Sequence, residues 1–198
     1  QDRKSRLMQV GTFIKTPSPH VVEILGLSGI DAGLIDAEHG PFDRGSTDLM
    51  MVAGRAANLP LMVRVPNKNP DTFLWALDVG ASALVVPHVD TADQAAAVAV
   101  AARFKGGERG FSNSPRYGRY GTTNVEEALA LGDQARVYCQ IESAGAVGEV
   151  EAIAATAGVH GLVIGRADLA LSMGLARLDH PDVLAATEVS IRAARAAG

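Results

Sequence analysis

The feature that most constrains the fold is a repeat of short apolar runs, each followed by residues with helical spacing. The runs begin near residues 11, 33, 61, 83, 137 and 161, so the repeat is 22 to 28 residues long apart from one long insertion. Short apolar runs bounded by turn residues are typical of buried strands. Strands that alternate with helices form βαβ units and a parallel sheet, so we expect an α/β fold.

Several of the intervening helices have clear starts. Ser18-Pro19 and Asn69-Pro70 each place an N-cap residue before a proline at the first helical position, which is a favoured pairing. Thr91 opens an alanine-rich helix that we expect to reach about Arg103. Further helices are expected at 46–57, 147–157 and 181–197.

The long insertion covers residues 104–124 and is rich in Gly, Arg, Ser and Tyr. Loops of this length are usually functional or mobile. We expect the insertion to border a site for an anionic small molecule, and a plain surface excursion is the alternative. Arg-Tyr clusters also occur in single-stranded nucleic-acid binding, but that function is disfavoured in a chain of net charge -4.

The length and composition of the chain limit the class of protein to which it can belong. A chain of 198 residues predicts one domain with a substantial core. No stretch reaches the roughly 18 uninterrupted apolar residues of a membrane span, so no membrane partner is expected. The single cysteine, Cys139, excludes an internal disulfide framework and favours a reducing cytoplasm. It lies in an apolar run, which predicts an inert buried thiol.

Ionisable side chains follow the predicted strands at the point where each strand ends. In barrels of alternating strands and helices, the carboxyl ends of the strands carry the chemistry. The candidates are Asp36, Glu38 and His39, then Arg64, His88, Asp90, Gln140, Glu142, Arg166 and Asp168. Taken alone, the polar residues of the stretch 33–40 could equally be solvated or cap the next helix, so this stretch by itself supports a structural role as well as a functional one.

Glu142 and Asp168 follow neighbouring strands of the predicted sheet. Two carboxylates without a cysteine or a histidine pair suit a hard cation such as Mg²⁺ or Mn²⁺, which keeps several waters. A zinc site built on His or Cys clusters is not supported. The alternative for either carboxylate alone is a helix N-cap, for which Asp168 is well placed.

Six motifs in consistent order resemble the HpcH/HpaI aldolase family of class II, metal-dependent pyruvate aldolases, which includes 4-hydroxy-2-oxoheptanedioate aldolase. They are Ile35-Asp36-Ala37-Glu38-His39-Gly40, Val63-Arg64-Val65-Pro66, Leu77-Asp78-Val79-Gly80-Ala81, Val86-Pro87-His88-Val89, Gln140-Ile141-Glu142 and Ile164-Gly165-Arg166-Ala167-Asp168-Leu169. Any one of them alone would be weak support, whereas the six together span nearly the whole chain. The resemblance implies an eight-stranded (β/α)8 TIM barrel.

The resemblance also implies a divalent metal, Mg²⁺, Mn²⁺ or Co²⁺, held by Glu142 and Asp168. The metal would polarise the ketone of a bound 2-oxo acid. Gln140 matches a residue beside that keto acid. The backbone at Gly165 and Ala167 matches the place that holds its carboxylate.

The remaining site residues come from the first half of the chain. Arg64 matches the family arginine that faces the developing enolate, which makes it both a catalytic and a substrate-binding residue. His39 matches the catalytic histidine that acts on the aldol hydroxyl. An acidic residue should orient His39: the family indicates Asp78, whereas Asp36 is nearer in sequence.

The chain departs from the family pattern in two respects. Arg166 stands where many relatives have proline, so a long cation lies beside the carboxylate site or points to solvent. The family also continues past the position of Gly198 with two further strands. We therefore expect residues 1–198 to be a single barrel domain that is C-terminally incomplete, with its last two strand-helix units missing. Family members exchange a C-terminal helix, which implies a homo-oligomer, a hexamer by resemblance.

These observations predict a lyase that reversibly cleaves 4-hydroxy-2-oxo acids to pyruvate, or a related 2-oxo acid, and an aldehyde. A related lyase acting on a CoA thioester, like the citrate-lyase β-subunit, is the enzyme alternative. The Asp-x-Glu-His sequence favours the aldolase. The non-enzyme alternative is a truncated paralogue that binds a 2-oxo acid or assembles with partner subunits.

Overall fold

The structure is a computed structural model that describes residues 8–198. The chain divides into two compact units and passes through each of them twice. The first unit consists of the chain up to Leu84 together with Gly110–Ala135, and the second consists of Val85–Arg109 with Arg136–Gly198. Residues 1–7 of the predicted single domain lie outside the described range.

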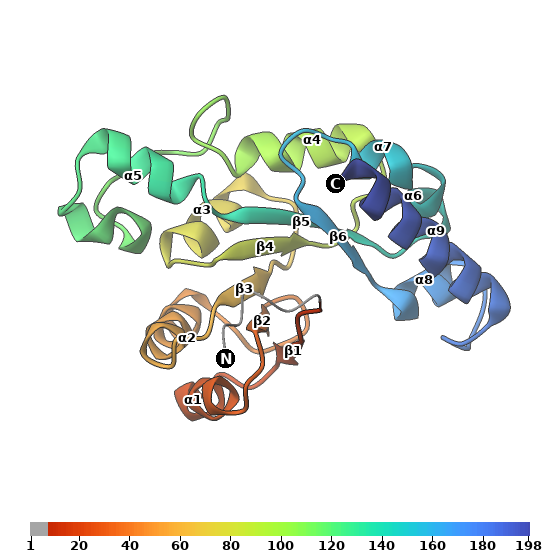
Figure 1. Cartoon of the computed structure of the whole chain (residues 1–198), viewed down its shortest axis with the longest axis horizontal. Helices are drawn as coiled ribbons and strands as arrows, with labels where there is room; N and C mark the ends of the chain where they lie inside the picture. The colour runs from red at the N-terminus through yellow and green to blue at the C-terminus, as the bar shows by residue number, and fades with distance from the viewer. Residues whose placement is uncertain (1–7) are drawn as a thin grey trace. The chain divides into compact units, whose positions relative to one another are not determined.

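Parallel strands form the sheet of the first unit (Figure 1). They are β1 (Gly11–Ile14), β2 (Ala32–Asp36) and β3 (Leu61–Arg64). The parallel pairing predicted from the repeat is confirmed in this unit. The register ends with Asp36 of β2 opposite Arg64 of β3. An acid and a base therefore lie side by side where the two strands end.

A helix follows each of these strands. They are α1 (Pro19–Leu27), α2 (Arg44–Ala56) and α3 (Pro70–Asp78). α1 and α2 lie side by side (Figure 1). The expected N-cap of α3 is confirmed, because the Asn69 side chain accepts a hydrogen bond from the backbone N–H of Asp71. Ser18 occupies the N-cap position of α1, but its side chain makes no capping hydrogen bond.

The start of α2 differs from the sequence prediction. The helix begins at Arg44, two residues before the predicted start at Ser46, because Asp43 forms a capping box with Ser46. Asp43 Oδ1 accepts from the Ser46 N–H at 2.7 Å, and Ser46 Oγ accepts from the Asp43 N–H at 2.9 Å. This box satisfies two backbone donors at once, which fixes the first turn.

The long insertion is more ordered than a plain loop. It ends in a 3₁₀ helix, η2 (Arg116–Gly121), and is followed by α5 (Val125–Gly132). The sequence predicts no helix between the insertion and the fifth strand, and that omission is wrong. Asn124 is the N-cap of α5, and its Oδ1 accepts from the Glu127 N–H at 2.9 Å.

The boundary between the units falls within β4 (Ala83–Val86). The second unit contains the parallel pair β5 (Arg136–Ile141) and β6 (Gly161–Ile164). Its helices are α4 (Ala92–Ala101), α6 (Ala144–Gly148), α7 (Val150–Ala154), α8 (Arg166–Ser172) and α9 (Pro181–Ala197). The expected helix near 147–157 is thus replaced by two short ones, and α8 is an additional helix that the sequence does not predict.

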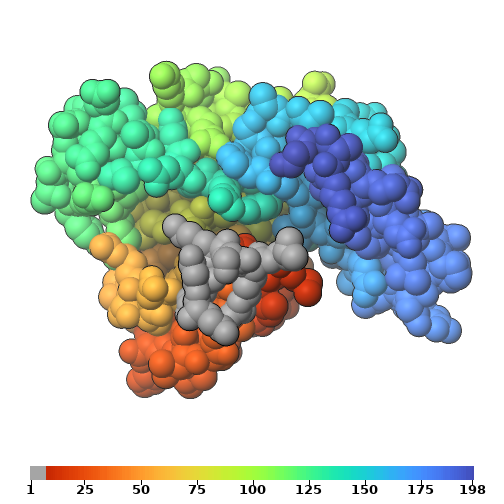
Figure 2. All heavy atoms as spheres, viewed as in Figure 1, coloured from red at the N-terminus to blue at the C-terminus, as the bar shows by residue number. Residues whose placement is uncertain are grey.

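The long helix α9 packs against α6, α7 and α8 (Figure 1). A buried cluster of Leu169, Ala170, Val183 and Ala186 joins α8 to α9. The other side of α9 lies on the surface of the second unit, where part of it is visible in dark blue in Figure 2. The cluster fixes α8, and with it the polar residues of its first turn.

The strands follow one another in chain order, β1 to β6. This order, with parallel pairing and intervening helices, confirms the α/β fold class. The closed eight-stranded barrel, with two strand-helix units missing from this chain, remains a prediction. Among residues 8–198, no helix is both long enough and apolar enough to cross a membrane.

Candidate functional site

The first candidate cluster lies at the ends of β2 and β3 in the first unit. Arg64 donates from Nε to Asp36 Oδ1 at 2.9 Å and from Nη2 to Asp36 Oδ2 at 2.8 Å. Both residues are buried. The contact is bidentate, so it fixes the plane of the guanidinium as well as its position. The predicted site residues Asp36 and Arg64 are thus brought together by the strand register.

The environment of Asp36 favours its ionised form. Burial by itself raises the pKa of this carboxyl, but hydrogen bonds from Arg64 and from the His39 N–H outweigh it. The positive charge of Arg64 and a contact from Lys15 Nζ at 3.2 Å act in the same direction, and the pKa falls to about 2. Asp36 is therefore an anchor for Arg64 and not a proton donor near neutral pH.

Glu38 and His39 extend this cluster. Glu38 Oε2 lies 3.2 Å from Arg64 Nη1 and 3.8 Å from His39 Nε2. The carboxylate nearest the His39 ring in these contacts is therefore Glu38, which the sequence places at the strand end but does not assign a role. Glu38 lies in the turn that follows β2, so the alternation of the strand does not indicate this contact.

Asp78, the family's expected partner of His39, lies elsewhere in the first unit. It is the last residue of α3, which starts after the carboxyl end of β3 and runs for 9 residues. A helix of that length spans about 12 Å from its first to its last residue. No contact between Asp78 and His39 is found among the described residues, whereas the His39 N–H donates to Asp36 Oδ1 at 3.1 Å.

The second candidate cluster surrounds Glu142, which follows β5 in the second unit. Glu142 is 3% exposed, and its Oε1 accepts from the backbone N–H of His88 at 2.7 Å. Its Oε2 accepts from Gln140 Nε2. A Cβ at Gly165 would lie 2.9 Å from both Cβ and Oε2 of Glu142, so only glycine leaves room for this side chain. The structure thus brings Gln140, Glu142 and Gly165 together with His88, which the sequence places at a strand end without assigning it a role.

Asp168 lies in the first turn of α8 and is exposed. The N-cap of α8 is Gly165, so the alternative interpretation of Asp168 as an N-cap is wrong. Arg166 precedes it in the same turn and is also exposed. The Gly165 N–H already donates to the Ile141 carbonyl at 2.9 Å. The Ala167 N–H belongs to the first turn of α8. Because the amides of a first turn have no acceptor within the helix, this N–H can donate a hydrogen bond to an anion.

The donor set of the second unit fits a hard divalent cation. Carboxylate and amide oxygens are what Mg²⁺ and Mn²⁺ prefer, and such ions commonly use only one or two protein carboxylates. Gln140 Oε1 is buried and has no hydrogen-bond partner among the described residues. A buried polar atom of this kind indicates an absent ligand or water. Within residues 8–198, no group of three or more His, Cys, Asp or Glu side chains forms a preassembled metal site.

Cys139 lies next to Gln140 in β5 and is fully buried. Burial raises the pKa of its thiol to about 12. The thiolate is the nucleophilic form of cysteine, so this side chain is inert near neutral pH. The prediction of an inert buried thiol is confirmed.

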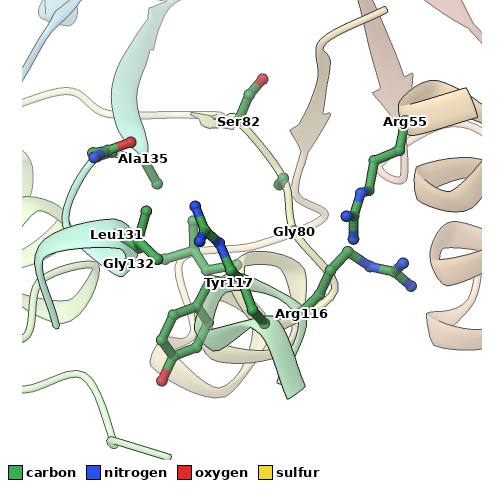
Figure 3. Close-up of a pocket in the computed structure, with 12 residues that line it drawn as sticks. Arg55, Gly80, Ser82, Arg116, Tyr117, Leu131, Gly132 and Ala135 are labelled. Carbon is green, nitrogen blue, oxygen red and sulfur yellow. The ribbon is translucent and has the colours of Figure 1, made fainter. Parts of the chain in front are cut away.

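A pocket of about 380 Å³ lies elsewhere in the first unit (Figure 3). The ends of α2, α3 and α5 and the 3₁₀ helix η2 line it, with Arg55, Arg116 and Arg119 among the lining residues. An adjoining pocket shares Arg55 and reaches Leu61, where β3 begins. Because Arg64 ends β3, these pockets lie at the opposite end of the strand from the Asp36–Arg64 pair.

Two of the arginines that line this pocket have structural partners. Arg116 Nε donates to the Val79 carbonyl at 2.7 Å, and its Nη2 donates to Asp48 Oδ1. Arg119 Nη1 lies 3.5 Å from Glu127 Oε1. The insertion therefore borders a pocket rich in cations, but two of these cations already face carboxylates. The expected binding of an anionic small molecule beside the insertion remains a prediction.

The protein has parallel strands that alternate with helices, and buried carboxylates lie at or just after the strand ends. It is therefore an α/β protein with acidic sites at the carboxyl ends of its strands. Residues 9–198 match the family model described as HpcH/HpaI aldolase/citrate lyase. The chain belongs to this family. The resemblance seen in the six sequence motifs is thereby confirmed.

Two curated relatives of the chain are named as aldolases. The chain is 37% identical over 179 residues to the 5-keto-4-deoxy-D-glucarate aldolase of Klebsiella pneumoniae, covering 89% of this chain and 69% of the relative. It is 38% identical over 195 residues to the 4-hydroxy-2-oxovalerate aldolase of Rhodococcus jostii, covering 96% of this chain and 74% of the relative. These similarities support an aldolase-type enzyme.

The fold is also similar to solved structures. The crystal structure of an HpcH/HpaI aldolase/citrate lyase family protein from Burkholderia cenocepacia superposes with a TM-score of 0.89 at 36% sequence identity. The match covers 94% of this chain and 76% of that one. The order of strands and helices described above is therefore that of a solved family member over nearly the whole chain.

Proposed function

We propose that the protein is a metal-dependent aldolase that cleaves a 4-hydroxy-2-oxo acid to pyruvate, or a related 2-oxo acid, and an aldehyde. The observation that carries the proposal is the buried carboxylate of Glu142. Both of its oxygens are held by nitrogen donors, and the Oε1 atom of neighbouring Gln140 is without a partner among the described residues. A buried carboxylate with this environment, in a chain of an aldolase family, is suited to hold a cation.

Glu142 and Asp168 are the proposed ligands, and Mg²⁺, Mn²⁺ or Co²⁺ the proposed ion. When bound, such a cation supplies Lewis acidity to the ketone of the substrate. Gln140 would orient the keto acid through its side-chain amide. The Ala167 N–H would hold its carboxylate, and the absence of a side chain at Gly165 leaves room beside Glu142.

Arg64 would stabilise the negative charge that develops as the bond breaks. Its contacts to Asp36 use Nε and Nη2, and its contact to Glu38 uses Nη1. A guanidinium has five N–H donors, so two remain for an enolate oxygen. The two carboxylates hold the guanidinium in place before substrate arrives, which is what electrostatic stabilisation of a transition state requires.

His39 is the proposed general base. Its ring is exposed, with 57% of the side chain accessible, and it lies beside Glu38. In the cleavage direction, the C4 hydroxyl loses its proton toward His39 and the C3–C4 bond breaks. The electron pair moves to the C2 oxygen to form the enolate. Protonation of C3 then yields the 2-oxo acid, and the C4 fragment leaves as the aldehyde.

Substitutions separate these roles. Glu142→Ala or Asp168→Ala should abolish metal-dependent cleavage and weaken metal binding. His39→Ala should lower kcat by about 10² to 10⁴, the usual contribution of a general base, while metal stays bound. Turnover is measured by pyruvate release, and binding is measured by calorimetry with Mn²⁺. Metal retained at full affinity in both carboxylate variants would contradict the ligand assignment.

The substrate is tested with the compounds that the relatives' names suggest. We expect cleavage of 5-keto-4-deoxy-D-glucarate, 4-hydroxy-2-oxovalerate or both. Comparison of kcat/KM for the two acids shows whether the site prefers a long polar or a short apolar aldehyde fragment. Cleavage of a CoA thioester in place of these acids would indicate the citrate-lyase alternative. No turnover of either class would leave a binding or assembly role. A homo-oligomer and a cytoplasmic location remain part of the proposal, and native mass spectrometry tests the first.

A further inference from the structure

We propose that His88 is a positioning residue for the carboxylate of Glu142. Two nitrogens of this one residue lie against the same oxygen atom. The His88 backbone N–H donates to Glu142 Oε1 at 2.7 Å, and ring Nδ1 lies 3.1 Å from that oxygen. The inference rests on the proposed function, because it assigns to His88 the task of orienting a metal ligand.

The backbone of His88 is in an unusual conformation that serves this contact. Its φ is +54°, in the left-handed region that glycine adopts most readily. Histidine tolerates this region better than most residues, but such conformations persist only where the surrounding structure holds them. A glycine here would meet the backbone requirement without cost. The presence of a ring that reaches Glu142 therefore indicates that the side chain itself is needed.

The segment that carries His88 is anchored at Asp90, through both its side chain and its backbone. Asp90, two residues further on, accepts a hydrogen bond from Ser143 Oγ, and Ser143 directly follows Glu142. The Asp90 N–H donates to Gln94 Oε1 at 2.9 Å, in the first turn of α4. The turn after β4 and the turn after β5 are thus tied together twice, so His88 cannot shift without disturbing its neighbours.

The contacts of Glu142 limit where a cation could bind. An ionised carboxylate has about four acceptor positions, two on each oxygen. His88 occupies Oε1 with its N–H and, when Nδ1 carries a proton, with its ring as well. Gln140 occupies one position on Oε2. When Nδ1 carries a proton, the open position on Oε2 would be available to a cation, and His88 would prevent rotation of the carboxylate.

The test compares Mn²⁺ binding by His88→Gly with that by the unsubstituted protein. The glycine keeps the left-handed backbone and its N–H but removes the ring. We expect the Mn²⁺ dissociation constant to rise about tenfold, the lower end of what loss of a residue behind a metal ligand costs. His88→Asn should recover part of the affinity, since asparagine also tolerates this backbone conformation and carries a side-chain N–H.

Asn58→Gly is the matched control. Asn58 also has a positive φ, +52°, but belongs to the first unit, so the substitution changes left-handed backbone without touching Glu142. Its Mn²⁺ affinity should equal that of the unsubstituted protein. Equal affinity for His88→Gly, or equal losses in both variants, would overturn the role of His88. Unchanged binding by Glu142→Gln would instead overturn the proposed metal ligand, which separates the two claims.

A second measurement does not depend on metal. In a crystal structure of metal-free His88→Gly, Glu142 should adopt more than one side-chain conformation, whereas the unsubstituted protein should show one. A single Glu142 conformation in the variant, with its carboxylate oriented as in the unsubstituted protein, would contradict the inference even if no metal were ever bound.

Discussion

The pairing of Arg64 with Asp36 links the stability of the first unit to its proposed chemistry. The pair is buried, and a buried charge that loses its partner is costly, typically by about 3–5 kcal/mol. The same contacts that stabilise the fold hold the guanidinium still. We therefore expect changes at Asp36 to affect both stability and turnover.

The acid sensitivity of this pair gives a prediction with a defined sign. The pKa of Asp36 is about 2 in the folded protein, below the ordinary value of 3.8 for this carboxyl. Between these values the unfolded state binds the proton more readily, so the stabilising contribution is present above about pH 4 and is lost toward pH 2. Asp36→Asn should lower stability at pH 7, and its deficit should shrink across this window. Urea unfolding of both proteins as a function of pH measures it, and a deficit that does not vary with pH would contradict the account.

Single-residue roles could be predicted from sequence only where a motif fixes the position. Asp36, Arg64 and Glu142 follow apolar strands, and their location at strand ends could be inferred from that pattern. The contacts of Glu38 with Arg64 and of His88 with Glu142 could not. They depend on strand register and on the left-handed backbone of one turn, neither of which has a sequence signal at these positions.

At the scale of elements, Arg116 attaches η2 to the helices of the first unit. It contacts the C-terminal end of α3 through Val79 and the side of α2 through Asp48. Gly80 has a φ of +100°, and a Cβ there would lie 2.7 Å from the Arg116 side chain, so glycine is required for this close approach. The insertion is therefore held by one cation that reaches two helices.

We expect Arg116→Ala to lower the free energy of unfolding by about 1–3 kcal/mol, because hydrogen bonds of a charged and largely buried group are lost. Arg119→Ala is the control in the same 3₁₀ helix. Its ion pair with Glu127 is exposed and 3.5 Å long, so its loss should cost at most about 1 kcal/mol. Chemical denaturation measures both. Similar losses in the two variants would contradict the role assigned to Arg116.

The elements that the sequence failed to predict share a physical cause. α5 and α8 are short, 8 and 7 residues, so hydrophobic spacing had little length in which to show itself. α8 also starts directly after β6 with only Gly165 between them. The longer helices, by contrast, carried N-cap and proline signals that survived in the structure, as at Asn69 and Pro70.

At the scale of the whole chain, the strand-helix repeat was sufficient to predict the parallel α/β fold. Each unit forms parallel strand pairs in chain order, as βαβ connectivity requires. The repeat could not show that the chain would divide into two compact units, because that division depends on which helices pack together. The family match over residues 9–198 relates both units to proteins named as aldolases.

The proposed aldolase activity depends on a cation held by the carboxylates of the second unit. The most direct measurement is pyruvate release from a racemic 4-hydroxy-2-oxo acid, first with EDTA and then with added Mg²⁺ or Mn²⁺, for the unsubstituted protein and for Glu142→Gln. We predict that EDTA abolishes release, that metal restores it in the unsubstituted protein, and that metal fails to restore it in Glu142→Gln. Release that persists in EDTA, or that metal restores equally in both proteins, would contradict the metal-dependent aldolase.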